Sequence, residues 1–517
     1  MRDVERHYSR KHRIVNRRSF LKHAAGGAVA VTLPQILAAT PHSHPPRAAA
    51  PAAPIRIRGQ VRTGGSGLAR VAVTDGFEVT DTAADGTFEL ISSAQRDFVS
   101  ISLPAGHQIP LNAAGTARFY ERIAPDSSGE AVAEFDLDRL DRSDENHCVF
   151  LLADIQTEDM DEMAWCHEQT VPDIHNVVQS LDGTPAFGIS CGDIMFDNLD
   201  LYPEYERAVS RTGIPFFQVV GNHDMDYSAR TDEGSTATFS QHFGPRYYSF
   251  NRGSVHYVIL DDVFWYGAGY LGYIDADQLT WLAADLQRLE PGSTVIAAAH
   301  IPVLGSRHTR EGQSNPGIGT SVTNRQALYR LLEPFEAHIL TGHMHESEHL
   351  FEHGVHEHVN GAVSGAWWSG PICGDGTPSG YSVYDVRGSE ITWRYKSTGH
   401  DFHHQVRLYA RGADPEAPDE VVANVWDWDP AWEVVWYEGA DRRGAMARRV
   451  GHDPLSVELH TGPELPPRRT WVEPYRTGHL FYAPVSADAD TIHVEATDRF
   501  GRAYSATLPN EEGVQDR

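Results

Sequence analysis

Between residues 146 and 399, short and almost wholly apolar runs alternate with stretches of helical periodicity. The apolar runs are CVFLLA, AFGIS, PFFQVV, VHYVIL, TVIAAA and AHILT, and DADQLTWLAADLQRL is one of the helical stretches. Strands that lack an apolar–polar alternation are buried on both faces, as in layered proteins whose sheets are covered by helices. The pattern therefore predicts a layered α/β domain over residues 146–399.

Several of these apolar runs end in side chains that can bind a metal ion. These side chains are Asp154 with Gln156, then Asp193, then Asn222 with His223 and Asp224, then His300, and finally His343 with His345. Loops at the carboxyl ends of strands in such sheets open into one crevice, so we expect the side chains to converge. Taken singly, each has an ordinary explanation as a turn cap or a core histidine. Five such placements are poorly explained by five independent caps.

The donor types indicate which ions such a site would hold. Carboxylate, imidazole and amide oxygen without thiolate favour Mn, Fe, Zn or Mg over a structural zinc ion. The chain has only four cysteines and no CxxC spacing, so neither a cysteine zinc site nor a dense disulfide framework is predicted. The candidate ligands outnumber the needs of one ion. Two ions about 3.5–4 Å apart share a bridging carboxylate, and Asp193, alone at its strand end, fits that role.

The order D-x-Q, G-D, G-N-H-D, H, G-H-x-H resembles that of the calcineurin-like metallophosphoesterase family. Nearly the whole chain after residue 39 is similar to a bacterial subgroup of this family. The stretches SGAWWSGP, DGTPSGY and NVWDWDPAWEV carry that similarity. The resemblance implies a layered α/β metallophosphoesterase β-sandwich core with flanking helices. It also implies an N-terminal all-β sandwich and a C-terminal all-β domain.

The resemblance also implies a role for each matching residue. The first of two divalent ions would be held by Asp154, Gln156, Asp193 and His345, and the second by Asp193, Asn222, His300 and His343. His223 would donate a proton to the leaving oxygen, Asp224 would orient His223, and Gly221 would let the backbone turn sharply. The family commonly has histidine where this chain has Gln156, so the identity and occupancy of the first metal remain open.

The remaining parts of the chain favour β structure. Alternating runs between Gly-Gly and Asp-Gly turns predict an N-terminal β-sandwich over residues 55–140. Short runs that include LSVELH predict an all-β domain over residues 402–511. GVHEHVNGAV, at residues 354–363, is typical of a strand with alternating exposed imidazoles. A second metal cluster among His349, His353, His356 and His358 is a minor alternative to that interpretation.

The first 39 residues have the features of an export signal. A basic region with Arg17 and Arg18 in RRSFLK precedes a short, weakly apolar run and a small-residue site. This pattern is typical of a twin-arginine signal peptide over residues 1–39, and a Pro/Ala linker follows over residues 40–54. The chain is therefore expected to be exported, to the periplasm or the extracellular space.

The formal net charge of −28 argues against binding to nucleic acid or an anionic membrane. No internal stretch is apolar enough to span a membrane, so stable membrane insertion is not expected. These observations predict an exported phosphoesterase that uses a two-metal-activated hydroxide on phosphate mono- or diesters, either small molecules or envelope-derived. The alternative is a non-catalytic, metal-containing cell-envelope or glycan-binding protein on a degenerate scaffold. The sequence leaves the leaving group, the native metals and the oligomeric state open.

Overall fold

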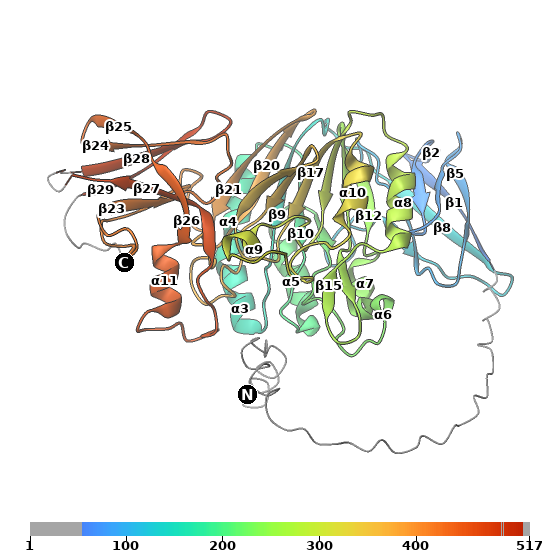
Figure 1. Cartoon of the computed structure of the whole chain (residues 1–517). Helices are drawn as coiled ribbons and strands as arrows, with labels where there is room; N and C mark the ends of the chain where they lie inside the picture. Colours follow the sequence, from blue (N-terminus) through green and yellow to red (C-terminus); the bar gives the residue numbers. More distant parts are fainter. Residues whose placement is uncertain (1–53, 487–488, 490, 510–517) are drawn as a thin grey trace, which may run out of the picture. The chain divides into compact units, whose positions relative to one another are not determined.

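Two mixed β-sheets stack on each other in the middle of the chain (Figure 1). The computed structural model describes residues 54–486, 489 and 491–509, so the predicted signal peptide and all but the last residue of the predicted linker lie outside it. The first sheet has the strand order β11 (Phe216–Val219), β10 (Ala186–Cys191), β9 (Asn146–Leu152), β20 (Gly380–Arg387) and β21 (Glu390–Ser397). The second has the order β12 (Tyr248–Arg252), β13 (Val255–Ile259), β16 (Thr294–Ala298), β17 (Glu336–Thr341), β19 (Val355–Val359) and β18 (Glu348–Glu352).

Alternate residues of each strand face two different cores. On β9, Leu151 packs between the two sheets, whereas Phe150 packs outwards against helices. The helices over the first sheet are α3 (Met160–Trp165), a π turn (Cys166–Thr170), α4 (Val171–Ser180), α5 (Tyr202–Ser210) and α7 (Ala237–Phe243), and the short helix α6 (Asp232–Ser235) lies beside α7. Those over the second are α8 (Ala276–Leu286) and α10 (Arg325–Leu332). This is the layered arrangement that the wholly apolar strands predict.

Strands β9, β10 and β11 are parallel, and so are β13, β16, β17 and β19. The loops at their carboxyl ends carry the predicted ligands. A hairpin of β14 (Val263–Trp265) and β15 (Tyr270–Gly272) and the short helix α9 (Arg307–Arg310) follow two of these strands along the chain. Among the described residues, no helix is long and apolar enough to cross a membrane.

Two small sheets precede the core. One contains β1 (Ile55–Thr63), β2 (Ser66–Gly67), β5 (Thr87–Ser92) and β8 (Glu130–Leu137), and the other β3 (Ala72–Thr74), β4 (Val79–Asp81), β6 (Phe98–Ile101) and β7 (Tyr120–Arg122). Their turns are the Gly-Gly and Asp-Gly sites of the sequence, with Gly64, Gly65, Gly76 and Gly86 in the left-handed region. The N-terminal region is thus all-β, as expected.

Two further sheets follow the core. They contain β22 (Arg407–Tyr409), β23 (Glu420–Asn424), β27 (Arg476–Pro484) and β26 (Ala447–His452), and β25 (Asp441–Ala445), β24 (Glu433–Glu438), β28 (Thr491–Thr497) and β29 (Ala503–Pro509). The described residues from 54 onward belong to one compact unit, and the domain boundaries 55–140, 146–399 and 402–511 stay a prediction.

Two local expectations are wrong. LSVELH is not a strand but lies in helix α11 (Pro454–Thr461), because Asp453 caps it by accepting from the Ser456 N–H at 2.9 Å and Pro454 occupies the first turn. The imidazoles of GVHEHVNGAV are not exposed either. His356 and His358 of β19 are only 6% and 1% exposed, because β18 continues the sheet beyond β19 and Trp393 packs on their rings.

Candidate metal centre

The predicted ligands follow the ends of five parallel strands. Asp154 and Gln156 follow β9, Asp193 follows β10, Asn222 follows β11, His300 follows β16, and His343 and His345 follow β17. The two groups of strands belong to different sheets, so their loops approach one another only because the sheets stack. The structure brings all seven side chains together.

Three of these side chains surround one nitrogen atom of a fourth, Nε2 of His300. This atom lies 3.2 Å from Asp193 Oδ1 and 3.2 Å from Asn222 Oδ1. It lies 3.1 Å from Nδ1 of His343. Potential ligand atoms of Asp193, His300 and His343 all lie within 4.8 Å of one another, which is compatible with one shared ion.

Of the other three side chains, Gln156 contacts the second carboxylate oxygen of Asp193, and Asp154 and His345 lie beside each other. The Gln156 amide donates from Nε2 to Asp193 Oδ2 at 2.9 Å, and His345 Nε2 lies 3.6 Å from Asp154 Oδ1. Both Gln156 Oε1 and His345 Nε2 are buried without a hydrogen-bond partner. Buried polar atoms are rarely left unpaired, so these two atoms favour a ligand that the protein itself does not provide.

The backbone of the centre is strained. Asp154, Gln156, Asp193, His343 and His345 have φ between 47° and 67°, in the left-handed region that non-glycine residues seldom occupy. Each such residue costs of the order of 1 kcal/mol or more, and such strain gathers at functional sites. Five of the seven predicted ligands are therefore held in conformations that local propensity opposes.

Glycines next to the ligands permit close approach of the loops. A Cβ on Gly221 would lie 2.0 Å from the Asp193 backbone nitrogen, and one on Gly192 would lie 2.3 Å from the His300 ring. A turn does begin at Gly221, whose carbonyl accepts from the Asp224 N–H at 3.2 Å, but the φ of Gly221 is not positive. The close approach of Asp193 is what requires a glycine here.

The pKa values of the centre are strongly shifted. Burial raises the pKa of Asp154 to about 8, although the nearby charge of His300 lowers it in part. For His300, burial lowers the pKa but Asp193 outweighs it, and the pKa rises to about 10. Burial lowers the pKa of His343 and His345 to about 3, which keeps both imidazoles neutral with lone pairs to offer. Divalent cations would stabilise the ionised forms of the buried carboxylates of Asp154 and Asp193, so the residues fit such ions.

His223 is oriented by a residue that the sequence did not single out. Its Nδ1 lies 2.5 Å from Oδ1 of Asp197, and its ring stacks on Phe196 at 4.6 Å. Burial lowers the pKa of His223, but Asp193 and the hydrogen bond to Asp197 outweigh burial and leave the pKa raised. Tyr227 also donates to Asp197 Oδ1, at 2.6 Å.

The prediction that Asp224 orients His223 is wrong. The Asp224 carboxylate accepts from the backbone N–H groups of Ile194, Met195 and Gly221, at 3.1, 3.1 and 2.9 Å, and from the Tyr202 hydroxyl at 3.1 Å. It therefore fastens the loop after β10 to the loop after β11. Asp197 lies only four residues after Asp193, but a lone carboxylate in a loop carries no sequence signal for this role.

Other residues that the sequence missed support the centre from outside. Asp262, after β13, accepts from the backbone N–H groups of His300 and Ile301 through Oδ1, at 3.2 and 3.1 Å. The Trp367 ring stacks on His345 with centroids 4.0 Å apart, and the Tyr270 ring is nearly perpendicular to that of His343, with centroids 6.0 Å apart. Asp262 follows the apolar run VHYVIL, whose end the metal pattern did not include.

Three models of one family match successive parts of the chain. The N terminal of Calcineurin-like phosphoesterase matches residues 55–140, Calcineurin-like phosphoesterase matches residues 149–347, and the C terminal of Calcineurin-like phosphoesterase matches residues 357–504. The chain belongs to the calcineurin-like phosphoesterase family. The middle match contains all seven predicted metal ligands of this calcineurin-like phosphoesterase, together with His223.

Individual relatives are more distant. Purple acid phosphatase 15 of Arabidopsis thaliana is 28% identical over 149 residues, which are 26% of this chain and 25% of that protein. The match thus spans a quarter of the length of this curated relative. Two similar structures are a dimetal phosphatase from Danio rerio and a purple acid phosphatase from yellow lupin (Lupinus luteus) seeds. The first is 14% identical over 48% of this chain and 96% of its own, with a TM-score of 0.33. The second is 12% identical over 69% of this chain and 66% of its own, with a TM-score of 0.32.

Proposed function

We propose that this calcineurin-like phosphoesterase hydrolyses phosphate mono- or diesters at two divalent cations. The observation that carries the proposal is the convergence of seven donor side chains, two of which have buried ligand atoms without a partner, Gln156 Oε1 and His345 Nε2. The ions would be Mn, Fe, Zn or Mg, because the donors are carboxylate, imidazole and amide oxygen.

The seven side chains divide into two sets that share Asp193. The first ion would be held by Asp154, Gln156, Asp193 and His345, and the second by Asp193, Asn222, His300 and His343. This division is supported by the contacts around His300 Nε2 on one side and by the unpartnered atoms on the other. When bound, the cations supply Lewis acidity, which offsets charge on the phosphoryl oxygens and lowers the pKa of a water molecule.

His223 would act as the proton donor to the leaving oxygen. Its Nδ1 is engaged by the carboxylate of Asp197, which accepts a hydrogen bond and so requires a proton on Nδ1. A protonated His223 then has one exchangeable proton left, on Nε2, and this atom lies 4.0 Å from Asp193 Oδ2. The transferable proton is therefore beside the proposed bridging ligand.

The location and the substrate class are also part of the proposal. Arg17 and Arg18 in RRSFLK support export by the twin-arginine route to the periplasm or the extracellular space. The strongly acidic chain would gather few polyanions by its overall field, which favours small or envelope-derived phosphoesters bound at the cations themselves. Membership of a bacterial subgroup with both flanking β regions is proposed on the stretches SGAWWSGP and NVWDWDPAWEV.

The test uses the exported, mature protein with p-nitrophenyl phosphate and bis-p-nitrophenyl phosphate. We expect hydrolysis with added manganese, loss of activity in chelator, and loss of both ions in Asp193→Asn. Asp200→Asn is the matched control, because Asp200 is an exposed carboxylate on the same stretch of chain. Full metal content and full rate in Asp193→Asn would refute the bridging role. A metal-loaded protein that cleaves neither ester would instead favour the non-catalytic alternative.

A further inference from the structure

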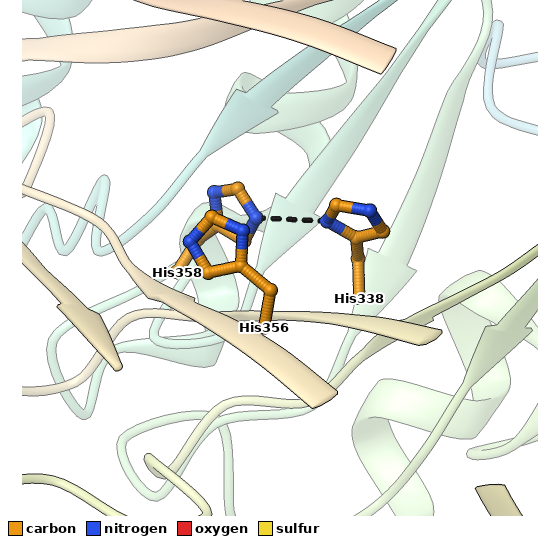
Figure 2. Close-up of side chains that lie close together, drawn as sticks. All are labelled: His338, His356 and His358. Carbon is orange, nitrogen blue, oxygen red and sulfur yellow. Dashed lines mark hydrogen bonds between the residues drawn. The ribbon is translucent and has the colours of Figure 1, made fainter. Parts of the chain in front are cut away.

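A second group of histidines lies on the sheet that carries β17, away from the strand ends that hold the predicted ligands. His338 is on β17, His349 is on β18, and His356 and His358 are on β19. Their rings pack beside Trp393 of β21, with centroids 4.7–6.3 Å from it. Figure 2 shows His338, His356 and His358 with ring nitrogens directed into one shared space. One potential ligand atom of each of these three lies within 4.8 Å of the others.

The hydrogen bonds behind His356 fix which of its nitrogens is free of a proton. Asp427 Oδ1 lies 3.0 Å from Nε2 of His349, and a carboxylate can only accept, so this Nε2 carries the proton. His349 Nδ1 lies 3.0 Å from His356 Nε2, and a His349 whose one ring proton is on Nε2 accepts this hydrogen bond through Nδ1. In that tautomer His356 Nε2 carries the proton, and the Nδ1 of His356 presents a lone pair.

The other two histidines face each other through a short contact. His338 Nδ1 lies 3.0 Å from His358 Nε2. The second nitrogen of His358, Nδ1, is buried and has no hydrogen-bond partner. Burial lowers the pKa of His338 to about 4, and that of His358 well below its ordinary value, so both imidazoles are neutral at pH 7. Neutral imidazole is the form that binds metal ions.

We propose that His338, His356 and His358 form a trihistidine site for one divalent cation of the Zn, Cu or Ni class. These ions prefer imidazole donors, whereas Mg and Ca do not. With Zn–N distances of about 2.0–2.1 Å, two ligands of a tetrahedral ion lie about 3.3–3.4 Å apart, close to the His338–His358 separation. No residue of this site belongs to the proposed catalytic centre.

The hydrogen bonds from Asp427 to His349 and from His349 to His356 would hold a metal-binding His356 in place from outside the site. Histidine ligands commonly donate their second N–H to a carboxylate or another acceptor, which fixes the ring and makes it more basic. The cation Arg499 lies over the Trp393 ring at 5.2 Å and is paired with Asp429 at 2.8 Å. Since Asp427 follows β23, an ion here would link β17 and β19 to the C-terminal sheets.

The test counts zinc ions in the full mature chain after chelation and reconstitution with zinc. We expect His356→Gln to bind one ion fewer than the wild type, with unchanged phosphoesterase rate. His353→Gln is the matched control, because His353 lies on the same hairpin but packs against Tyr329 instead, and it should lose none. The catalytic variant Asp193→Asn should keep one ion, which separates this inference from the proposed function. Equal zinc content in wild type and His356→Gln, or no zinc in Asp193→Asn, would overturn the site.

A second measurement covers the outcome in which His356→Gln does not fold. Crystals of the intact chain soaked in zinc should give an anomalous peak between the three rings at the zinc edge. Density in the catalytic centre without a peak between these rings would show that the histidines form only a neutral hydrogen-bonded network, and the inference would fall.

Discussion

Replacing Asp197 should slow the reaction while both ions stay bound. The contact between His223 Nδ1 and Asp197 Oδ1, at 2.5 Å, is a hydrogen bond to a charged group, and such bonds contribute about 1.5–3 kcal/mol. The Asp197 side chain is 36% exposed, so solvent screens it and the low end of that range applies. A loss of about 1.5–2 kcal/mol corresponds to a fall in kcat/KM of roughly 10- to 30-fold for Asp197→Ala.

The leaving group distinguishes this positioning role from a structural one. If Asp197 holds His223 in place to donate a proton, an alkyl phosphate, whose alkoxide leaves poorly, should lose more rate than p-nitrophenyl phosphate. Asp197→Asn should recover part of the rate, because an amide oxygen can still accept from Nδ1. The assay is kcat/KM on both esters, together with metal content for each variant.

Asp224→Asn provides the contrast. Asp224 accepts three backbone N–H groups, and an amide NH₂ in place of one oxygen would leave a donor without an acceptor, at a cost of about 1–3 kcal/mol. This variant should unfold at lower temperature and bind metal less well, with equal effects on the two esters. Our reasoning is refuted if Asp197→Ala keeps full rate on the alkyl ester, or if Asp224→Asn is the variant with the selective loss.

Three further predictions concern other parts of the chain. Gln156→His should tighten the first metal site, because imidazole is the stronger donor for Zn or Fe, and an unchanged metal titration would exclude Gln156 as a ligand. Burial lowers the pKa of His147 to about 4, so the unfolded chain binds the extra proton between pH 6.5 and 4. The free energy of unfolding should therefore fall by about 3 kcal/mol as the pH drops from 6.5 to 4, because protonation of His147 favours the unfolded chain. Urea unfolding of His147→Phe should depend less on pH over this window than that of the wild type. Replacing both Arg17 and Arg18 with lysine should leave folded precursor inside the cell, and normal secretion of this variant would point to another export route.

The sequence by itself determined the layered core and the grouping of the predicted ligands. Both depend on local pattern: wholly apolar runs form strands buried on two faces, and residues at the ends of parallel strands must share one edge. Asp154, Asp193, Asn222, His300 and His343 could therefore be named together before any contact was known. The family resemblance supplied the division into two metal sets, which stays a prediction.

Only the tertiary structure decided which side chains hold the site residues in place and which local segments become helix or are buried. Asp224 follows His223 directly, yet its carboxylate turns to the loop after β10, and Asp197 reaches the ring instead. LSVELH alternates as a strand would, but the cap at Asp453 makes it a helix. His356 and His358 are buried because Trp393 of the other sheet covers them, which no local pattern on β19 contains. For His223 and for the two histidines of β19, the deciding contact joins segments that are distant in sequence. For LSVELH, a helix cap competes with a strand pattern of similar energy.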